Sequence, residues 1–257
     1  MTEPLLAAQS LFKRFGAVQA SNDFSLEVAR GELHALIGPN GAGKTTAINQ
    51  LSGELAPDRG AICFDGRHIT HLPVHRRARR GLARSYQITS VFDQLTVQEN
   101  LSLAIQAHNG HSFRFWRKAS GDPVIRQAIG PALERVGLEE RAAIPAANLS
   151  HGEKRQLEVG MALAGHPKML LLDEPYAGMG PGGAVELTKL IRHLKAEFTI
   201  LLVEHDMRAV FALADRITVL VYGTAIASGT PDEIRRNPEV RQAYLGDETP
   251  EEGSARA

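Results

Sequence analysis

The stretch Gly38-Pro39-Asn40-Gly41-Ala42-Gly43-Lys44-Thr45 matches the pattern G-x-x-x-x-G-K-[ST] and decides the fold. Its glycines allow the backbone to wrap closely around phosphate groups, with N–H groups directed at the phosphate oxygens. A strand-like run from Glu32 to Ile37 precedes it, and a helical pattern from Lys44 to about Leu51 follows. Phosphate binding at a helix N-terminus requires this order. We predict a nucleotide-binding loop rather than a plain glycine-rich turn, because chance would give the pattern in roughly 1 of 200 such sequences.

The residues of this loop have distinct expected roles. Lys44 would bridge the β- and γ-phosphates, Thr45 would bind Mg²⁺, and Thr46 would reach the α-phosphate. The helix that begins near Lys44 adds the positive end of its dipole. The other predicted nucleotide-binding residues contribute mainly backbone contacts: Gly38, Pro39, Asn40, Gly41, Ala42 and Gly43.

A second run, Met169–Leu172, leads directly into the acids Asp173 and Glu174. An apolar strand that ends in two acids places them at the carboxyl edge of a sheet, where ligands of such folds bind. We expect Asp173 to hold Mg²⁺ through water, and Glu174 to orient and deprotonate an attacking water. A simple turn is the alternative, and the phosphate-binding loop makes it the weaker one.

Short apolar runs alternate with helical patterns, which indicates an α/β fold with parallel strands. The strand candidates are Glu32–Ile37, Ala61–Phe64, Met169–Leu172, Thr199–Val203 and Ile217–Val221. An N-terminal antiparallel patch is suggested by the short runs Leu5–Phe12, Ala17–Ala20 and Phe24–Val28. We predict a core of residues 1–87 and 166–246, a helical insert over 88–165, and a flexible tail over 247–257.

The composition excludes several classes of protein. With 257 residues, 43% of them apolar, the chain can bury a core, and 29 basic against 29 acidic side chains leave no net charge. The single cysteine, Cys63, excludes an intramolecular disulfide and favours a reducing compartment. We find no signal peptide and no apolar run near the ~18 residues of a membrane span, and therefore expect a soluble, cytosolic chain. The basic run Arg76–Arg84 is interpreted as a solvated helix face, and no nucleic-acid partner is expected.

The stretch Leu149-Ser150-His151-Gly152-Glu153 resembles the LSGGQ signature of ATP-binding cassette (ABC) proteins. Further elements stand in the matching order over residues 5–246. They are Phe15, which resembles the aromatic residue that stacks on adenine, Gln87, which resembles the Q-loop glutamine, and His205, which resembles the switch histidine.

The resemblance implies a RecA-like P-loop NTPase core with an antiparallel β patch and an inserted α-helical subdomain. It implies ATP and Mg²⁺ as cofactors, with Gln87 also near the metal and Gln87 and His205 taking part in catalysis beside Glu174. It further implies a homodimer or heterodimer of two ATPase subunits, in which Ser150 and Gly152 contact the γ-phosphate held by the partner. From the residues alone, Ser150 is also a helix N-cap, with Glu153 completing a capping box.

This sequence departs from the family pattern at three positions. His151 and Glu153 replace a glycine and a glutamine of the signature, and Gly180 replaces the aspartate usual after the second acidic strand. The Gly180 departure weakens the expectation of contacts across a dimer from that position, without bearing on hydrolysis.

Finer resemblances point to the ATPases of branched-chain amino acid importers. The stretches that carry them are Gly81–Gln87, Leu95–Leu101, Glu204–Met207, Gly229–Pro231 and Ala243–Gly246. The ATPase of lipopolysaccharide export is similar over the same stretches, but the loop with Phe113, Phe115 and Trp116 favours the importer. The resemblance implies membrane permease subunits and, indirectly, a solute-binding protein as partners, and a peripheral position on the cytoplasmic face of the inner membrane. A non-transport cassette and a nucleotide-binding module without turnover are the remaining alternatives.

Overall fold

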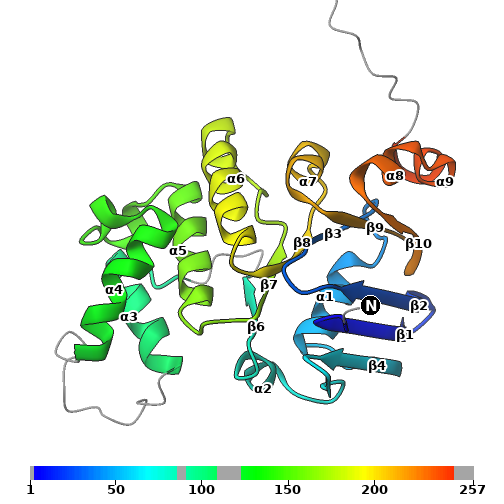
Figure 1. Cartoon of the computed structure of the whole chain (residues 1–257), viewed down its shortest axis with the longest axis horizontal. Coiled ribbons are helices and arrows are strands. Elements are labelled where there is room, and N and C mark those ends of the chain that lie inside the picture. Colours follow the sequence, from blue (N-terminus) through cyan, green and yellow to red (C-terminus); the bar gives the residue numbers. More distant parts are fainter. Residues whose placement is uncertain (1–2, 86–90, 109–122, 246–257) are drawn as a thin grey trace, which may run out of the picture.

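The computed structural model describes residues 3–85, 91–108 and 123–245, whose strands form two sheets (Figure 1). Gln87, the loop with Phe113, Phe115 and Trp116, and the tail 247–257 lie outside these described residues.

The larger sheet has the strand order β10-β9-β3-β8-β7-β6 and is parallel except for the pair β9 and β10. Its strands are β3 (Leu33–Ile37), β6 (Leu82–Ser85), β7 (Met169–Asp173), β8 (Thr199–Val203), β9 (Arg216–Val221) and β10 (Thr224–Gly229). Every residue of β3, β7 and β8 is buried. Such continuous apolar runs are typical of parallel strands covered on both faces. The sequence pattern did not predict β6 or β10, because neither has a clear apolar run.

The smaller sheet is antiparallel, with the order β2-β1-β4-β5. Its strands are β1 (Leu6–Phe15), β2 (Val18–Val28), β4 (Arg59–Phe64) and β5 (Arg67–His68). The expected antiparallel patch is present, but the expectation of short, separate runs is wrong. Ser10 and Asp23 adopt left-handed φ angles of 48° and 54°, and the register of β1 against β2 shifts three times. A β-bulge of this kind inserts an extra residue and bends the strand, while pairing with the neighbouring strand continues on both sides. The strand candidate Ala61–Phe64 is part of β4 and pairs antiparallel with β1 in this sheet.

The helices cover the larger sheet and extend to one side of it. Figure 1 shows α3, α4 and α5 grouped beside the sheets, with α5 next to α6. The helices are α1 (Lys44–Ser52), α2 (Val74–Ala78), α3 (Val97–His108), α4 (Pro123–Val136), α5 (His151–Leu163), α6 (Pro181–Lys195), α7 (Met207–Leu213), α8 (Pro231–Arg236) and α9 (Pro238–Val240). Short 3-10 turns span Glu139–Arg141 and Ala146–Asn148, and a π turn spans Arg241–Leu245.

The two faces of the larger sheet bury two different apolar clusters. In β8, Ile200 and Leu202 pack into a cluster with residues of α5, α6 and α7. Leu201 and Val203 face the other way, into a cluster shared with α1 and the smaller sheet. Because side chains alternate along a strand, one apolar strand supplies both cores. This packing fixes the ends of the central strands, from which the candidate site is built.

The basic run Arg76–Arg84 is only in part the solvated face that the sequence suggested: Arg76 and Arg79 are exposed, but two other arginines point inward. Arg77 is only 1% exposed, and the side chain of Arg84 is 7% exposed. Arg77 donates to backbone carbonyls near the end of α1, and Arg84 forms an ion pair with Asp173. The charge pattern was misleading here because polar partners distant in sequence lie inside the fold.

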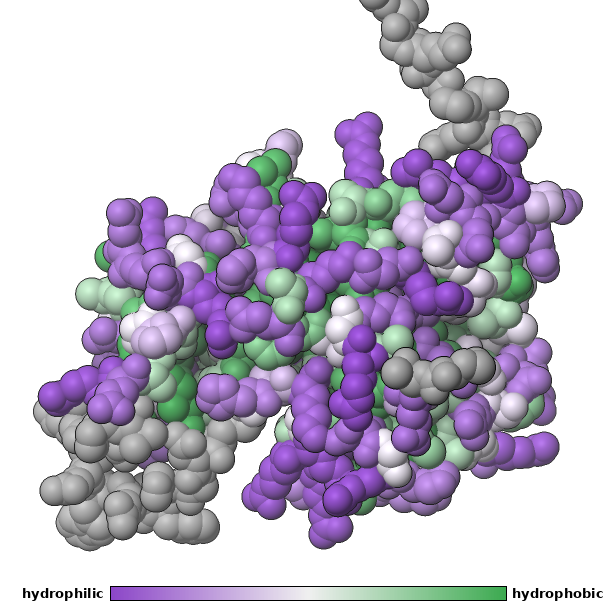
Figure 2. All heavy atoms as spheres, in the orientation of Figure 1, coloured by the Kyte–Doolittle hydropathy of each residue, from purple (hydrophilic) through white to green (hydrophobic). Residues whose placement is uncertain are grey.

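The outer surface is mostly polar on the face seen in Figure 2, where hydrophobic residues appear in small groups among hydrophilic ones. Among the residues described, none of the helices is both long enough and apolar enough to cross a membrane.

Candidate nucleotide-binding site

Three neighbouring parallel strands deliver the candidate site to one edge of the sheet. The phosphate-binding loop follows β3, Asp173 ends β7, and Glu204 and His205 follow β8, which lies between the other two. Leu36 of β3 and Asp173 of β7 both pair with Val203. The carboxyl ends of these strands therefore bring two of the predicted catalytic residues, Glu174 and His205, together.

Two glycines in the loop are required by close backbone contacts. A side chain at Gly38 would place its Cβ 2.1 Å from the Leu220 carbonyl oxygen, and one at Gly43 would come within 2.4 Å of the Ala20 carbonyl oxygen. Gly43 also has a left-handed φ of 102° and precedes α1 without a side-chain cap. The N–H groups of the first turn of α1 are thus not capped by a side chain, which suits an incoming phosphate.

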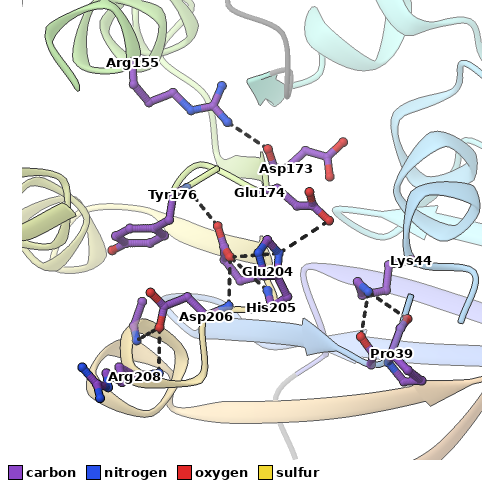
Figure 3. Close-up of polar contacts among 12 residues, drawn as sticks. Pro39, Lys44, Arg155, Asp173, Glu174, Tyr176, Glu204, His205, Asp206 and Arg208 are labelled. Carbon is purple, nitrogen blue, oxygen red and sulfur yellow. Dashed lines mark hydrogen bonds and ion pairs between the residues drawn. The ribbon is translucent and has the colours of Figure 1, made fainter. Parts of the chain in front are cut away.

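Lys44 lies buried at the start of α1 and folds back over the loop. Its Nζ donates to the carbonyl oxygens of Gly38, at 2.7 Å, and Pro39, at 3.1 Å (Figure 3). Burial lowers the pKa of Lys44, while the negative charges of Glu174, Glu204 and Asp173 oppose that shift.

The two predicted hydroxyl contacts lie beside Lys44. Thr45 is exposed and Thr46 is half-buried at the start of the same helix, and Asn40 is exposed on the loop. The exposed Thr45 hydroxyl and the Asp173 carboxylate are oxygen donors of the kind that Mg²⁺ prefers. The donors present in this chain therefore fit the predicted metal ion.

The acidic pair at the end of β7 is held in different ways. Asp173 is buried, its Oδ2 accepts from Arg84 Nη2, and its carbonyl oxygen accepts from Arg155 Nη2 at 2.9 Å. Glu174 has a left-handed φ of 43° and is only partly buried. A bulky residue rarely adopts this conformation, and such strain clusters at functional sites. Its N–H donates to the Val203 carbonyl oxygen at 2.9 Å.

His205 lies between two carboxylates at the end of β8. Its Nδ1 is 3.9 Å from Glu174 Oε1 and 3.8 Å from Glu204 Oε2, and its side chain is 56% exposed. These distances suit an ion pair of a protonated imidazole but are too long for hydrogen bonds. Glu204 is fully buried and accepts from three backbone N–H groups (Figure 3).

The signature residues begin α5 rather than lying on the sheet edge. Ser150 is the N-cap, and the predicted capping box is present, with Glu153 N donating to Ser150 Oγ at 3.3 Å and Ser150 N to Glu153 Oε2 at 2.8 Å. Gly152 follows in the first turn. His151 lies with Nε2 3.1 Å from the Ala177 carbonyl oxygen, in the loop after β7 of the same chain. The side chain that departs from the family pattern therefore packs within its own subunit.

Phe15, the predicted adenine-stacking residue, ends β1 and is 50% exposed. The ammonium of Lys13 lies 5.7 Å from the centre of its ring. An exposed aromatic ring at a strand end is available to a ligand. The structure gives no geometry for Gln87, the remaining predicted site residue, because it is outside the described residues.

Sequence analysis did not identify Arg84, Arg155 or Glu204 as parts of the site. Each is polar and almost fully buried, and each contacts a residue of the predicted machinery. The only local signal was that Arg84 and Glu204 lie close to the predicted Gln87 and His205 in sequence.

Comparisons with known proteins agree with this geometry. The family model described as ABC transporter matches residues 21–177. The chain belongs to the ABC transporter family. The model for the branched-chain amino acid ATP-binding cassette transporter also matches this ABC protein, over residues 226–250. The predicted fold, ATP binding and ATP hydrolysis of an ABC cassette are thereby confirmed.

Several relatives are similar over nearly the whole cassette. The high-affinity branched-chain amino acid transport ATP-binding protein LivG of Salmonella typhimurium is 43% identical, over 96% of this chain and 100% of its own. The lipopolysaccharide export system ATP-binding protein LptB of Acidithiobacillus ferridurans is 39% identical, over 95% and 98%. A solved structure, the ADP conformation of the cassette MJ1267 from an ABC transporter, is 30% identical with a TM-score of 0.83, covering 96% of this chain and 100% of that one.

Proposed function

We propose that this ABC cassette is the ATP-hydrolysing subunit of an importer for branched-chain amino acids or related small solutes. The observation that carries ATP hydrolysis is the convergence of Lys44, Asp173, Glu174 and His205 at the ends of β3, β7 and β8. The importer is favoured over the lipopolysaccharide exporter by the match over residues 226–250 and by the similarity to LivG.

In this proposal, the described residues act on ATP from their observed positions, and Gln87 takes the role that the family resemblance implies. Lys44 and the amides of the Gly38–Gly43 loop bind the β- and γ-phosphates, and Phe15 stacks on the adenine. Thr45, Asp173 and Gln87 hold Mg²⁺, which neutralises charge that develops on the phosphates. Glu174 accepts a proton from the attacking water, and His205 hydrogen-bonds to the γ-phosphate.

A second ATPase subunit completes the proposed site. Ser150 and Gly152 at the N-terminus of α5 would approach the γ-phosphate that a partner cassette holds, because N–H groups at a helix start attract phosphate. ATP then stabilises the closed dimer, and hydrolysis allows the dimer to open. The dimer thus has two states, and the bound ligand decides which of them is favoured. The motion would pass to permease subunits on the cytoplasmic face of the membrane.

A tagged pull-down from detergent-solubilised native membranes tests this assignment, with the co-purifying chains identified by mass spectrometry. We expect polytopic permease subunits that, reconstituted with this chain in proteoliposomes, drive ATP-dependent uptake of leucine. A permease that extracts lipopolysaccharide instead would support the exporter. Recovery of ribosomes or DNA, or of no membrane subunit, would contradict the transporter role.

A further inference from the structure

Glu204 is a fully buried carboxylate at the carboxyl end of β8, with 0% exposure. Burial raises the pKa of Glu204, because a charged carboxylate loses its hydration inside the protein. Backbone N–H groups of Tyr176, His205 and Asp206 oppose that shift by donating to the charged form. A buried carboxylate persists only where such hydrogen bonds replace water.

The three N–H groups belong to two different loops, and the two oxygens of Glu204 divide between them. Oε1 accepts from Tyr176 N at 2.9 Å, in the loop that follows β7. Oε2 accepts from His205 N at 2.9 Å and Asp206 N at 3.2 Å, in the loop that follows β8. Figure 3 shows the Glu204 carboxylate with Tyr176 on one side, and the His205 ring between Glu204 and Glu174.

The contact with Tyr176 reaches close to Glu174 along the chain. Glu174 N donates to the Val203 carbonyl oxygen, and Tyr176 N donates to Glu204. The end of β8 therefore holds the backbone after β7 through two N–H groups that are two residues apart. The same loop is fixed on its far side, where Tyr176 Oη is 2.9 Å from Thr188 Oγ1 of α6. These contacts flank the left-handed backbone of Glu174, whose Oε1 lies 3.9 Å from His205 Nδ1.

We propose that Glu204 is a positioning residue that fixes Glu174 and His205 relative to each other, one carboxylate oxygen holding each loop. This inference rests on the proposed function, since it takes Glu174 as the base and His205 as the phosphate contact. A misplacement of a reacting group by about 1 Å can cost on the order of 10²-fold in rate. The hydrogen bonds of Glu204 therefore act on turnover more than on nucleotide affinity.

The variant Glu204→Gln tests whether each carboxylate oxygen of Glu204 holds a different loop. An amide has one acceptor oxygen, and its NH₂ group must face either the Tyr176 N–H or the N–H groups of His205 and Asp206. One loop is therefore released, while the size of the side chain is kept. Glu204→Asp keeps the charge and both oxygens but is one methylene shorter, so it separates geometry from charge.

Asp206→Asn is the matched control. Asp206 is the N-cap of α7, where its Oδ1 accepts from Arg208 N at 2.9 Å and Ala209 N at 3.2 Å. Asparagine caps helices about as well as aspartate. This variant removes a negative charge two residues away without touching the loop after β7.

The measurement is hydrogen exchange by mass spectrometry on the purified full chain, with peptides that cover 174–180 and 203–208. We expect Glu204→Gln to speed exchange in at least one of these loops, with β3 and β7 unchanged, and Asp206→Asn to leave 174–180 as in the wild type. The kcat for ATP is expected to fall on the order of 10²-fold in both Glu204 variants. The nucleotide Kd by calorimetry should change by less than about threefold.

Three results would overturn the inference. They are unchanged exchange in both loops of Glu204→Gln, a kcat retained in Glu204→Asp, and an equal loss of kcat in Asp206→Asn. If Glu204→Gln does not fold, as judged by circular dichroism, hydrogen exchange and kcat are measured on Glu204→Asp instead. A wild-type chain that hydrolyses no ATP would contradict the proposed function instead, and the exchange experiment would still test the two-loop contact.

Discussion

Arg84 on β6 and Asp173 at the end of β7 form a buried ion pair, with Nη2 2.8 Å from Oδ2 and side chains only 7% and 5% exposed. The Nη1 of Arg84 donates to Asn49 Oδ1 at 2.8 Å and Ser52 Oγ at 2.9 Å, both on α1. The proposed metal-binding carboxylate is therefore tied to the helix that begins at the phosphate-binding loop. A guanidinium suits this position because its fork of donors reaches both partners at once.

Replacing Arg84 by methionine is expected to lower the free energy of unfolding by about 3–5 kcal/mol, because it leaves the Asp173 charge buried without its partner. Urea denaturation measures the change. The double variant Arg84→Met with Asp173→Asn should recover part of the loss, since contacting residues are not additive. Strict additivity of the two single changes would contradict the ion pair.

The parts of this protein that depend on local sequence could be predicted. The phosphate-binding loop, the acids at the end of β7 and the capping box of Ser150 and Glu153 each lie within a few residues of chain, so their geometry follows from backbone preferences. The structure places Lys44 and Asp173 at the same sheet edge, as the parallel-strand argument requires.

Contacts between distant segments could not be predicted in this way. Arg84 and Asp173 are 89 positions apart, and Glu204 and Tyr176 are 28 apart. From the sequence alone, a basic run is therefore interpreted as a solvated surface, because its buried hydrogen-bond acceptors lie far away along the chain. The continuous strand β2 was also missed, because the irregularity at Asp23 interrupts its apolar pattern while the pairing with β1 continues.

Glu174→Gln is expected to retain ATP binding and to lose most turnover, because a general base contributes about 10²–10⁴ in rate. Phosphate release gives the turnover and calorimetry gives the affinity. Glu186→Gln, an exposed acid of α6 paired with Lys189, serves as the control and should hydrolyse ATP like the wild type. Normal hydrolysis by Glu174→Gln would show that the proposed base is wrong.

Arg77→Met is expected to lower the free energy of unfolding by about 2–4 kcal/mol, because buried carbonyl groups lose their donor. Arg77 Nη1 donates to the carbonyl oxygens of Gln50, at 2.8 Å, and Leu51, at 2.7 Å, in the last turn of α1. Burial lowers the pKa of Arg77 to about 10, so it remains charged at neutral pH. Urea denaturation should show little change for Arg76→Met, since Arg76 lies exposed next to Arg77 on α2. Equal effects of the two variants would contradict this role.

Asp65 should contribute stability that depends on pH. Hydrogen bonds from Lys168 and Arg30 lower the pKa of Asp65 to about 2. Because the pKa is lower in the folded state, the contribution is complete above the ordinary aspartate pKa and is lost as the pH falls through about 2. Asp65→Asn should therefore unfold at lower urea than the wild type at neutral pH, with the gap narrowing below about pH 4. A gap independent of pH would contradict the assignment.

Lys44→Ala is expected to abolish tight binding of MgATP, because Lys44 supplies the only ammonium charge that we assign to the β- and γ-phosphates. Its Nζ lies over the phosphate-binding loop, hydrogen-bonded to the carbonyl oxygens of Gly38 and Pro39. Calorimetric titration with MgATP measures the loss. Lys189→Ala is the control, because Lys189 is exposed on α6 and pairs only with Glu186 among the described contacts. An affinity unchanged by Lys44→Ala, in a variant whose thermal unfolding matches the wild type, would exclude the phosphate-binding role of this loop.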